Sequence, residues 1–112
     1  MKFLIVGAVK NCETNLQETI NCLDKAFNFA KKIEYFFVES DSDDNTLTSL
    51  KKLKQSKSNL EFISLGNLSK DIPIRVERIA FCRKKYIEYL WNEQNKWVDY
   101  LVVVDMDGVC TE

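Results

Sequence analysis

Apolar and polar residues follow one another along this chain in blocks that predict an alternation of strands and helices. Four short apolar runs, at residues 3–9, 33–38, 60–65 and 100–104, have the length of strands, and the first is continuous, as in a strand covered on both faces. Between them, apolar residues recur every three or four positions, which is the spacing of one helix face. The predicted helices carry Leu16, Ile20, Leu23, Phe27 and Ala30; Leu47, Leu50 and Leu53; and Val76, Ile79, Ala80, Ile87, Leu90 and Trp91.

Local signals refine these elements. Thr14 and Gln17 have the spacing of a capping box ahead of the first helix. That helix is predicted to run as far as Lys31 and Lys32, cations that suit a helix C-terminus, and Pro73 suits the first turn of the third helix. The alternation itself predicts parallel strands joined by right-handed crossovers, with helices on both faces. We therefore expect residues 1–112 to form one α/β domain, three-layered and Rossmann-like, with a mainly parallel four-stranded sheet.

Composition argues against several classes of protein. The 112 residues carry a formal net charge of −1, so bulk charge does not favour nucleic acid or an anionic membrane. No stretch approaches the ~20 apolar residues of a membrane span, and the opening MKFLIVGAV is predicted to be a strand rather than a signal peptide. Four widely spaced cysteines and no histidine are typical of reduced thiols in a cytoplasmic protein rather than of a zinc site.

Polar residues follow three of the predicted strands at the point where each strand ends. Because parallel strands end at the same edge of a sheet, and ligands bind beyond that edge, we expect these residues to converge on one site. They are Lys10 and Asn11 after the first strand, Glu39, Ser40 and Asp41 after the second, and Asp105, Met106 and Asp107 after the fourth.

Asp105 and Asp107 form the most specific of these clusters. In an extended segment their side chains point the same way, and carboxylates that close repel unless a proton or a cation is shared between them. Mg²⁺ or Mn²⁺ suits such oxygen ligands and completes its shell with water and substrate phosphates. The pair predicts a phosphorylated ligand, most simply a nucleoside diphosphate. Solvated aspartates that merely end the strand are the plainer alternative.

Two other charged positions have alternative interpretations. Glu39 lies at a strand tip, where a carboxylate accepts hydrogen bonds from a base or a ribose, whereas the rest of its loop, ESDSDDNT, is typical of a turn in which Asp44 or Asn45 caps the next helix. Arg83 falls on the predicted inward face of the third helix. An arginine there either meets an anionic ligand, extends to the rim, or pairs with a protein carboxylate.

Four segments, in this order along the chain, are similar to motifs of one enzyme family. They are IVGAVKNCETNLQETI, the first strand and its helix; FFVESDSDDNT, like an acidic loop; RIAFCRKK, like an arginine-bearing helix; and VVVDMDGV, like a DxD strand. Together they make nearly the whole chain resemble the nucleotide-binding half of the GT-A glycosyltransferases, nearest to family-2-like enzymes and the related capsule mannosyltransferase-like group.

The resemblance implies a metal-dependent site for a nucleotide-diphospho-sugar, such as a UDP- or GDP-sugar, whose sugar is moved to an acceptor hydroxyl. The matching residues are Val9, where the family's first loop cups the base; Glu39, the acidic residue that contacts the nucleoside; Arg83, near the nucleotide; and Asp105 and Asp107, the DxD pair that binds the ribose and the Mg²⁺ or Mn²⁺ diphosphate.

The resemblance ends at the DxD. Gly108 stands where family-2 enzymes often carry another aspartate, and only GVCTE follows the pair. The family's acceptor-binding half and the catalytic base of its inverting members lie beyond this point, so no catalytic residue is assigned. We expect a donor-binding half that is shortened, degenerate or completed by a partner chain.

Two other interpretations stay open. DMDGV is similar to the DxDG motif of haloacid dehalogenase-like phosphatases, in which Asp105 would be the nucleophile and Asp107 the general acid/base. That motif normally opens its domain, whereas here it comes last. The other interpretation is a non-catalytic nucleotide-binding domain that self-associates through an exposed sheet edge, with Trp91 and Trp97 at the interface.

Overall fold

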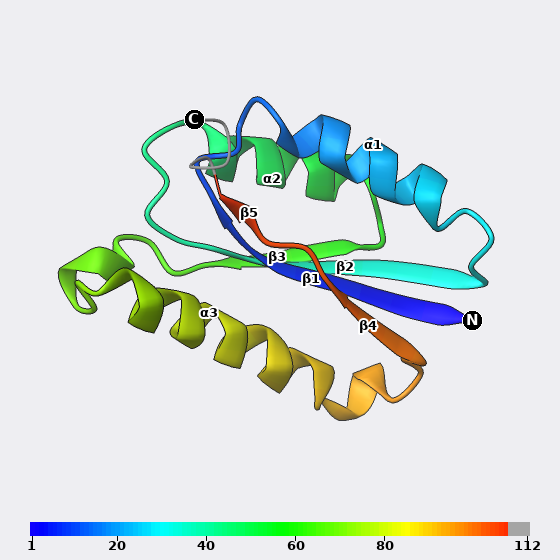
Figure 1. The fold of residues 1–112 in the computed structure, drawn as a ribbon. Coiled ribbons are helices and arrows are strands. Elements are labelled where there is room, and N and C mark those ends of the chain that lie inside the picture. Colours follow the sequence, from blue (N-terminus) through cyan, green and yellow to red (C-terminus); the bar gives the residue numbers. More distant parts are fainter. Residues whose placement is uncertain (108–112) are drawn as a thin grey trace.

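The computed structural model describes residues 1–107, apart from the side chain of Asp107, and shows strands alternating with helices (Figure 1). None of the helices in this part of the chain has the length and apolar character of a membrane span. The elements are β1 (Lys2–Lys10), α1 (Leu16–Ala26), β2 (Lys32–Glu39), α2 (Thr46–Ser56), β3 (Leu60–Ser64), α3 (Arg75–Leu90), β4 (Tyr100–Val103) and β5 (Met106–Asp107), with 3₁₀ turns at Leu68–Lys70 and Glu93–Asn95.

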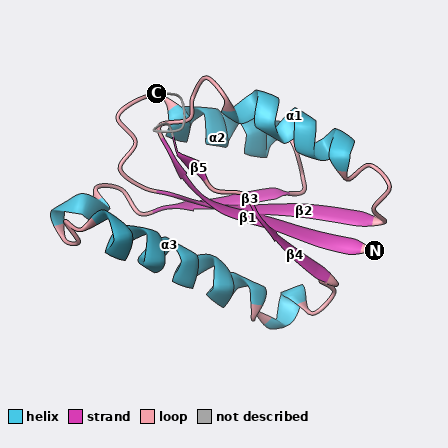
Figure 2. Cartoon of the chain, viewed as in Figure 1, coloured by secondary structure: helices cyan, strands magenta, loops and turns pink. Residues whose placement is uncertain are grey.

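β1 is the central strand of a parallel sheet with the strand order β3-β2-β1-β4. It pairs with β2 along one edge, and along the other edge it pairs first with β4 and then with β5. α1 and α2 cover one face of the sheet and α3 covers the other (Figure 2). The predicted α/β fold with a parallel four-stranded sheet is therefore confirmed. The chain winds outward from β1 to β3 and then crosses to the far side of β1, so the winding reverses between β1 and β4.

The sheet buries residues on both faces, which explains why the first apolar run is continuous. Alternate residues of β1 and β2 enter two separate hydrophobic cores. Ile5, Val9, Tyr35 and Phe37 pack under α1 and α2, whereas Leu4, Val6, Phe36 and Val38 pack against α3.

The last strand is interrupted where it crosses Gly7. The Val104 N–H donates to the Val6 carbonyl at 2.7 Å, and the chain then bulges before β5 resumes pairing with β1. A Cβ on Gly7 would lie 1.9 Å from the Val104 carbonyl oxygen, so only glycine permits this approach. The predicted continuous strand 100–104 therefore ends at Val103.

The predicted start of the first helix is wrong in detail. α1 begins at Leu16 after an Asn15 N-cap that makes no side-chain cap hydrogen bond, so Thr14 and Gln17 do not form a capping box. The entering turn is closed by the backbone instead, because the Cys12 carbonyl accepts from the Asn15 and Leu16 N–H groups.

The same helix also ends earlier than predicted, at Ala26 rather than at Lys31 and Lys32. Phe27 leaves the helix and packs its ring against Phe3, with centroids 4.9 Å apart, and Phe29 meets Phe3 edge-on. Tertiary packing of these aromatic rings thus overrides the helical spacing of the apolar residues.

The predicted inward face of the third helix is also partly wrong. Val76, Ile87 and Trp91 are exposed, Trp91 by 81% of its surface. Cys82 and Tyr86 are the buried residues of α3, and Tyr89 stacks on Phe36 with ring centroids 3.8 Å apart. The helix is rotated relative to the predicted stripe because tyrosine and cysteine, not isoleucine and tryptophan, fill the space against the sheet.

We predict that Gly7→Ala destabilises the protein by about 3 kcal/mol, because the added Cβ forces β1 away from the Val104 carbonyl. Gly66→Ala is the matched control. Gly66 has a φ of 66° but open space around it, so its substitution carries only the conformational cost of about 1 kcal/mol. Urea unfolding of both variants measures the difference, and equal losses would contradict the steric account.

Candidate functional site

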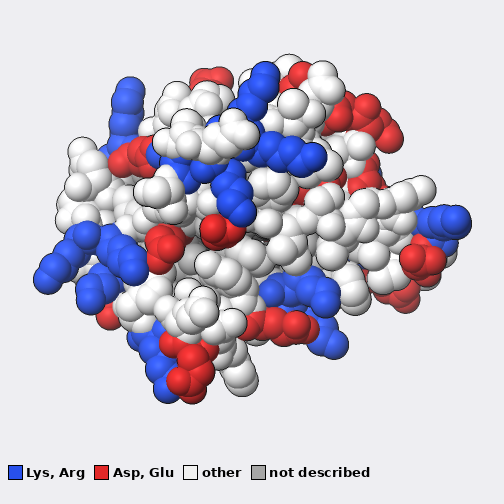
Figure 3. All heavy atoms as spheres, turned by 180° about the vertical axis from the view of Figure 1, so that it is seen from behind, with Lys and Arg blue, Asp and Glu red and all other residues white. Residues whose placement is uncertain are grey.

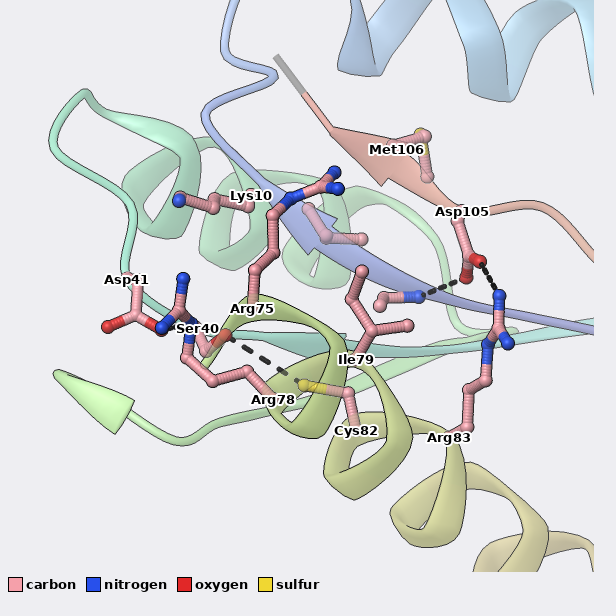
Figure 4. Close-up of a pocket in the computed structure, with 12 residues that line it drawn as sticks. Lys10, Ser40, Asp41, Arg75, Arg78, Ile79, Cys82, Arg83, Asp105 and Met106 are labelled. Atoms are coloured by element: carbon pink, nitrogen blue, oxygen red, sulfur yellow. Dashed lines mark hydrogen bonds and ion pairs between the residues drawn. The ribbon is translucent and has the colours of Figure 1, made fainter. Parts of the chain in front are cut away.

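A crevice opens at the carboxyl ends of β1 and β4, on the side of the sheet covered by α3 (Figure 4). It has a volume of about 290 Å³ and lies where the winding of the sheet reverses, the place where open α/β sheets bind ligands. The polar ends of three strands meet here as expected. The apolar lining comes from Ala8, Val9, Ile79, Cys82 and Met106, and the polar lining from Lys10, Ser40, Asp41, Arg75, Arg78, Arg83 and Asp105.

Asp105 joins β1 to α3 across this crevice. Its Oδ1 accepts the Ala8 N–H at 2.9 Å. Because the bulge after Val103 leaves this N–H of β1 without a backbone carbonyl from the last strand, the carboxylate takes the place of that carbonyl. Its Oδ2 lies 3.3 Å from Nη2 of Arg83. Arg83 thus pairs with a protein carboxylate, as one of the alternatives predicted. With 57% of its side chain exposed at the crevice edge, it also extends to the rim, as another of the alternatives predicted.

Asp107 is placed only by its backbone, which pairs with Lys10 in the β1–β5 ladder. Its side chain lies outside the described residues, so the predicted metal pair is described only at Asp105. Among the described residues, no group of three His, Cys, Asp or Glu side chains is arranged to hold a metal ion. The Asp105 carboxylate at the crevice still has the oxygen chemistry that Mg²⁺ or Mn²⁺ takes, since such ions need only one or two carboxylates.

Glu39 lies outside this crevice. It borders a second hollow of about 560 Å³ between the ends of β2 and β3, and its residue is only 3% exposed. Its Oε1 accepts from Ser64 Oγ at 2.5 Å and its Oε2 from the Ser42 N–H at 3.2 Å. In this structure the carboxylate holds the loop after β2 against β3.

Asp41 lines both hollows. Sequence reasoning named it as one of the residues after the second strand but gave the functional role to Glu39. The backbone of Asp41 is left-handed, with a φ of 56°, and its Oδ1 accepts the Ser69 N–H at 2.8 Å. Its Oδ2 is buried, has no hydrogen-bond partner among the described residues and lies 3.8 Å from Arg78 Nε. Burial alone would raise the pKa of Asp41, but hydrogen bonds from Ser69 and Ser40 and the charge of Arg78 outweigh it and lower the pKa.

Sequence reasoning named Lys10 and Arg83 but missed two other basic residues of the crevice, Arg75 and Arg78. Arg75 and Arg78 belong to the first turn of α3, and their spacing of three puts both on the face toward β1 (Figure 4). Arg78 is fixed by the carbonyls of Ile72 and Pro73, which accept from its Nη1 at 3.0 and 2.6 Å. The RVER sequence after Pro73 was the available signal.

The loops after β1 and β2 are cross-linked by side chains. Asp44 Oδ1 accepts the Thr46 N–H at 3.0 Å, so Asp44 supplies the hydrogen bond that the prediction gave to Asp44 or Asn45 at the start of α2. Its Oδ2 accepts the Glu13 N–H, and Glu13 accepts the Asn45 N–H in return. Desolvation opposes ionisation of Asp44, but hydrogen bonds from Thr46 and Glu13 outweigh it and lower its pKa.

The buried thiols have the character of packing groups. Burial is the main reason that the pKa of Cys12 is raised to about 12, and burial also raises the pKa of Cys82. Cys82 forms part of the crevice wall, where its Sγ lies 3.8 Å from Ser40 Oγ. Thiols held protonated in this way are poor nucleophiles, which agrees with reduced, inert cysteines.

Comparison of the chain with protein-family models, with curated protein sequences and with solved structures found no match.

Asp105 variants test the structural role of its two oxygens. We predict that Asp105→Ala lowers the free energy of unfolding by about 1 kcal/mol or more, because the Ala8 N–H loses its acceptor. Asp105→Asn is expected to lose less, since the amide oxygen can still accept. Arg83→Gln is expected to cost under ~1 kcal/mol, as is usual for an exposed pair. Urea denaturation gives the ranking, and a larger loss for Arg83→Gln than for Asp105→Ala would contradict it.

Acid should weaken the fold through Asp41 and Asp44. Both have pKa values below the ordinary value of 3.8, so the unfolded chain takes up protons before the folded chain does. Their stabilisation is complete above about pH 4 and is lost as the pH falls through the lower folded pKa values. Denaturation between pH 5 and pH 2 should show this loss, with a shallower decline in Asp44→Asn. Identical slopes in the two proteins would exclude Asp44 as a contributor.

Proposed function

We propose that the crevice binds a nucleotide-diphospho-sugar and that the chain is the donor-binding part of a GT-A-type glycosyltransferase. The observation that carries this proposal is the convergence of three strand ends and the start of α3 on one hollow at the reversal point of the sheet. That hollow combines an apolar wall with several charged groups, which suits a ligand that has a flat ring at one end and phosphates at the other.

Its size suits part of such a ligand. A volume of about 290 Å³ lies at the lower end of small-molecule sites. Ala8 and Ile79 are partly exposed in the crevice and supply apolar surface for a base, backed by the buried Val9 and Met106. The adjoining polar hollow beside Asp41 offers hydrogen-bonding groups for hydroxyls. Glu39, which the resemblance assigns to the nucleoside, borders that second hollow. To bind a nucleoside, its carboxylate would have to accept a further hydrogen bond beside those from Ser64 and Ser42.

The metal belongs to the proposal as well. Asp105 and Asp107 would hold Mg²⁺ or Mn²⁺, and a bound ion of this kind would neutralise the charge that develops on a departing nucleoside diphosphate. Arg83 orients the Asp105 carboxylate at the crevice by pairing with its Oδ2. None of the described residues is assigned as the base that activates an acceptor hydroxyl.

Ligand-induced stabilisation tests the proposal. We predict that a UDP- or GDP-sugar raises the melting temperature, because binding to the folded state alone adds about 2.7 kcal/mol at a concentration one hundred times the Kd. Mn²⁺ should enlarge the shift, and Asp105→Asn should remove that enlargement. Asp99→Asn is the matched control, since Asp99 also accepts a backbone N–H from β1, that of Lys2, but at the opposite end of the strand.

The absence of a shift with every sugar nucleotide tried would overturn the proposal. Hydrolysis of a generic phosphate ester that disappears in Asp105→Asn would favour the phosphatase interpretation instead, because that reaction requires Asp105 as the attacking nucleophile.

A further inference from the structure

We propose that Lys10 and Asp41, together with Arg75, form a subsite that binds a phosphate group and a neighbouring hydroxyl directly, without a metal ion. The inference deepens the proposed function, because it assigns the phosphate of the ligand to protein cations. The chemical class it selects is a phosphorylated sugar, either free or as part of a nucleotide.

The charge balance of the crevice is the first evidence. Its described lining carries four cations, Lys10, Arg75, Arg78 and Arg83, against two carboxylates, Asp41 and Asp105, a net charge of +2. The whole chain carries −1, and Lys and Arg side chains lie interspersed with Asp and Glu over the face seen in Figure 3. Within the described lining, cations thus outnumber carboxylates, which favours an anionic ligand.

Lys10 is a cation of the crevice that no carboxylate of the described residues compensates. Arg83 is paired with Asp105, and Arg78 is engaged with two carbonyls and lies near Asp41. Lys10 is half-buried at the end of β1, and its ammonium has no ion-pair partner within residues 1–106. A partly desolvated charge of this kind gains from an anion that enters the site, and a phosphate supplies several acceptor oxygens.

Asp41 supplies an independent observation. Its side chain is 7% exposed, and the Oδ2 atom is buried without a hydrogen-bond partner among the described residues. Leaving such an acceptor unmatched is costly, so a donor from a ligand would be favourable there. A carboxylate oxygen does not attract phosphate, but it accepts a hydrogen bond from a hydroxyl.

The two groups lie on the same wall. Lys10 and Asp41 each line both hollows, so they stand where the apolar crevice meets the polar one. Arg75, the first residue of α3, reaches across from the facing helix toward the end of β1 (Figure 4). One ligand could therefore serve both groups: its phosphate would lie near Lys10 and Arg75, and its sugar hydroxyl would donate a hydrogen bond to Asp41.

Titration with ribose 5-phosphate and with inorganic phosphate, both in EDTA and at low salt, tests the subsite. We expect ribose 5-phosphate to bind about tenfold more tightly than phosphate, because it adds a hydrogen bond to a charged acceptor. Lys10→Gln should weaken both ligands about tenfold. Lys54→Gln is the matched control: it removes the same charge from a surface pair with Glu61, and it should bind as the wild type does.

Asp41→Asn separates the hydroxyl contact from the phosphate contact. Asparagine is isosteric and tolerates the left-handed backbone, so the variant should fold. We expect its affinity for phosphate to be unchanged or higher, and its preference for ribose 5-phosphate to fall to about threefold or less. An unchanged preference would refute the role of Asp41, and equal binding by Lys10→Gln and the wild type would refute that of Lys10.

The remaining outcomes distinguish this inference from the proposed function. No binding of ribose 5-phosphate in EDTA, together with stabilisation by sugar nucleotides in Mn²⁺, would overturn the subsite and leave the proposed function standing. Binding of ribose 5-phosphate in EDTA with no stabilisation by any sugar nucleotide would overturn the proposed function and support the subsite. An equal loss in Lys54→Gln and Lys10→Gln would indicate a bulk charge effect and overturn the subsite.

Discussion

The close approach of the Val104 carbonyl to Gly7 is the constraint on which the edge of the sheet depends. It breaks the last strand into β4 and β5 and leaves the Ala8 N–H without a backbone acceptor at the bulge. The Asp105 carboxylate fills that position, and in doing so it is anchored at the mouth of the crevice. One steric requirement in β1 therefore determines where an ionisable side chain lies at the end of another strand.

Left-handed backbone turns the chain away from this edge at three places. Asn11, Asp41 and Gly66, which come just after β1, β2 and β3, have φ values of 48°, 56° and 66°. Two of these residues are not glycine, and conformations of this kind in non-glycine residues persist where surrounding contacts hold them. Asn11 accepts from the Asp43 N–H and Asp41 from the Ser69 N–H, so each is held by a neighbouring loop.

The charged groups around the crevice fall into two kinds. Arg83 with Asp105, and Arg78 with the carbonyls before α3, connect separate elements and serve the architecture. Lys10 makes no such connection among the described residues, and Oδ2 of Asp41 accepts no hydrogen bond from them and has only the 3.8 Å contact with Arg78 Nε. Groups that the fold does not satisfy internally are the ones that a ligand can satisfy, which is why the proposed subsite rests on them rather than on the more conspicuous ion pair.

Sequence reasoning predicted the strand–helix alternation, the parallel sheet and the meeting of strand ends. These depend on local periodicity and on general connection rules that hold for any chain with this pattern. It also predicted that Val9 and Asp105 would lie at one edge. It did not predict which carboxylate would enter the crevice, because Glu39 and Asp41 are two residues apart, both acidic, and differ only in the loops that later contact them.

The amino-acid sequence by itself determined the architecture, because burial on both faces of β1 follows from an apolar run that needs no knowledge of its neighbours. Only the tertiary structure decided the rotation of α3, the pairing of Arg83 and the break at Gly7. Each of these depends on contacts between residues that are far apart in the sequence, such as Val104 and Gly7. The local pattern of apolar and polar residues carries no information about such contacts.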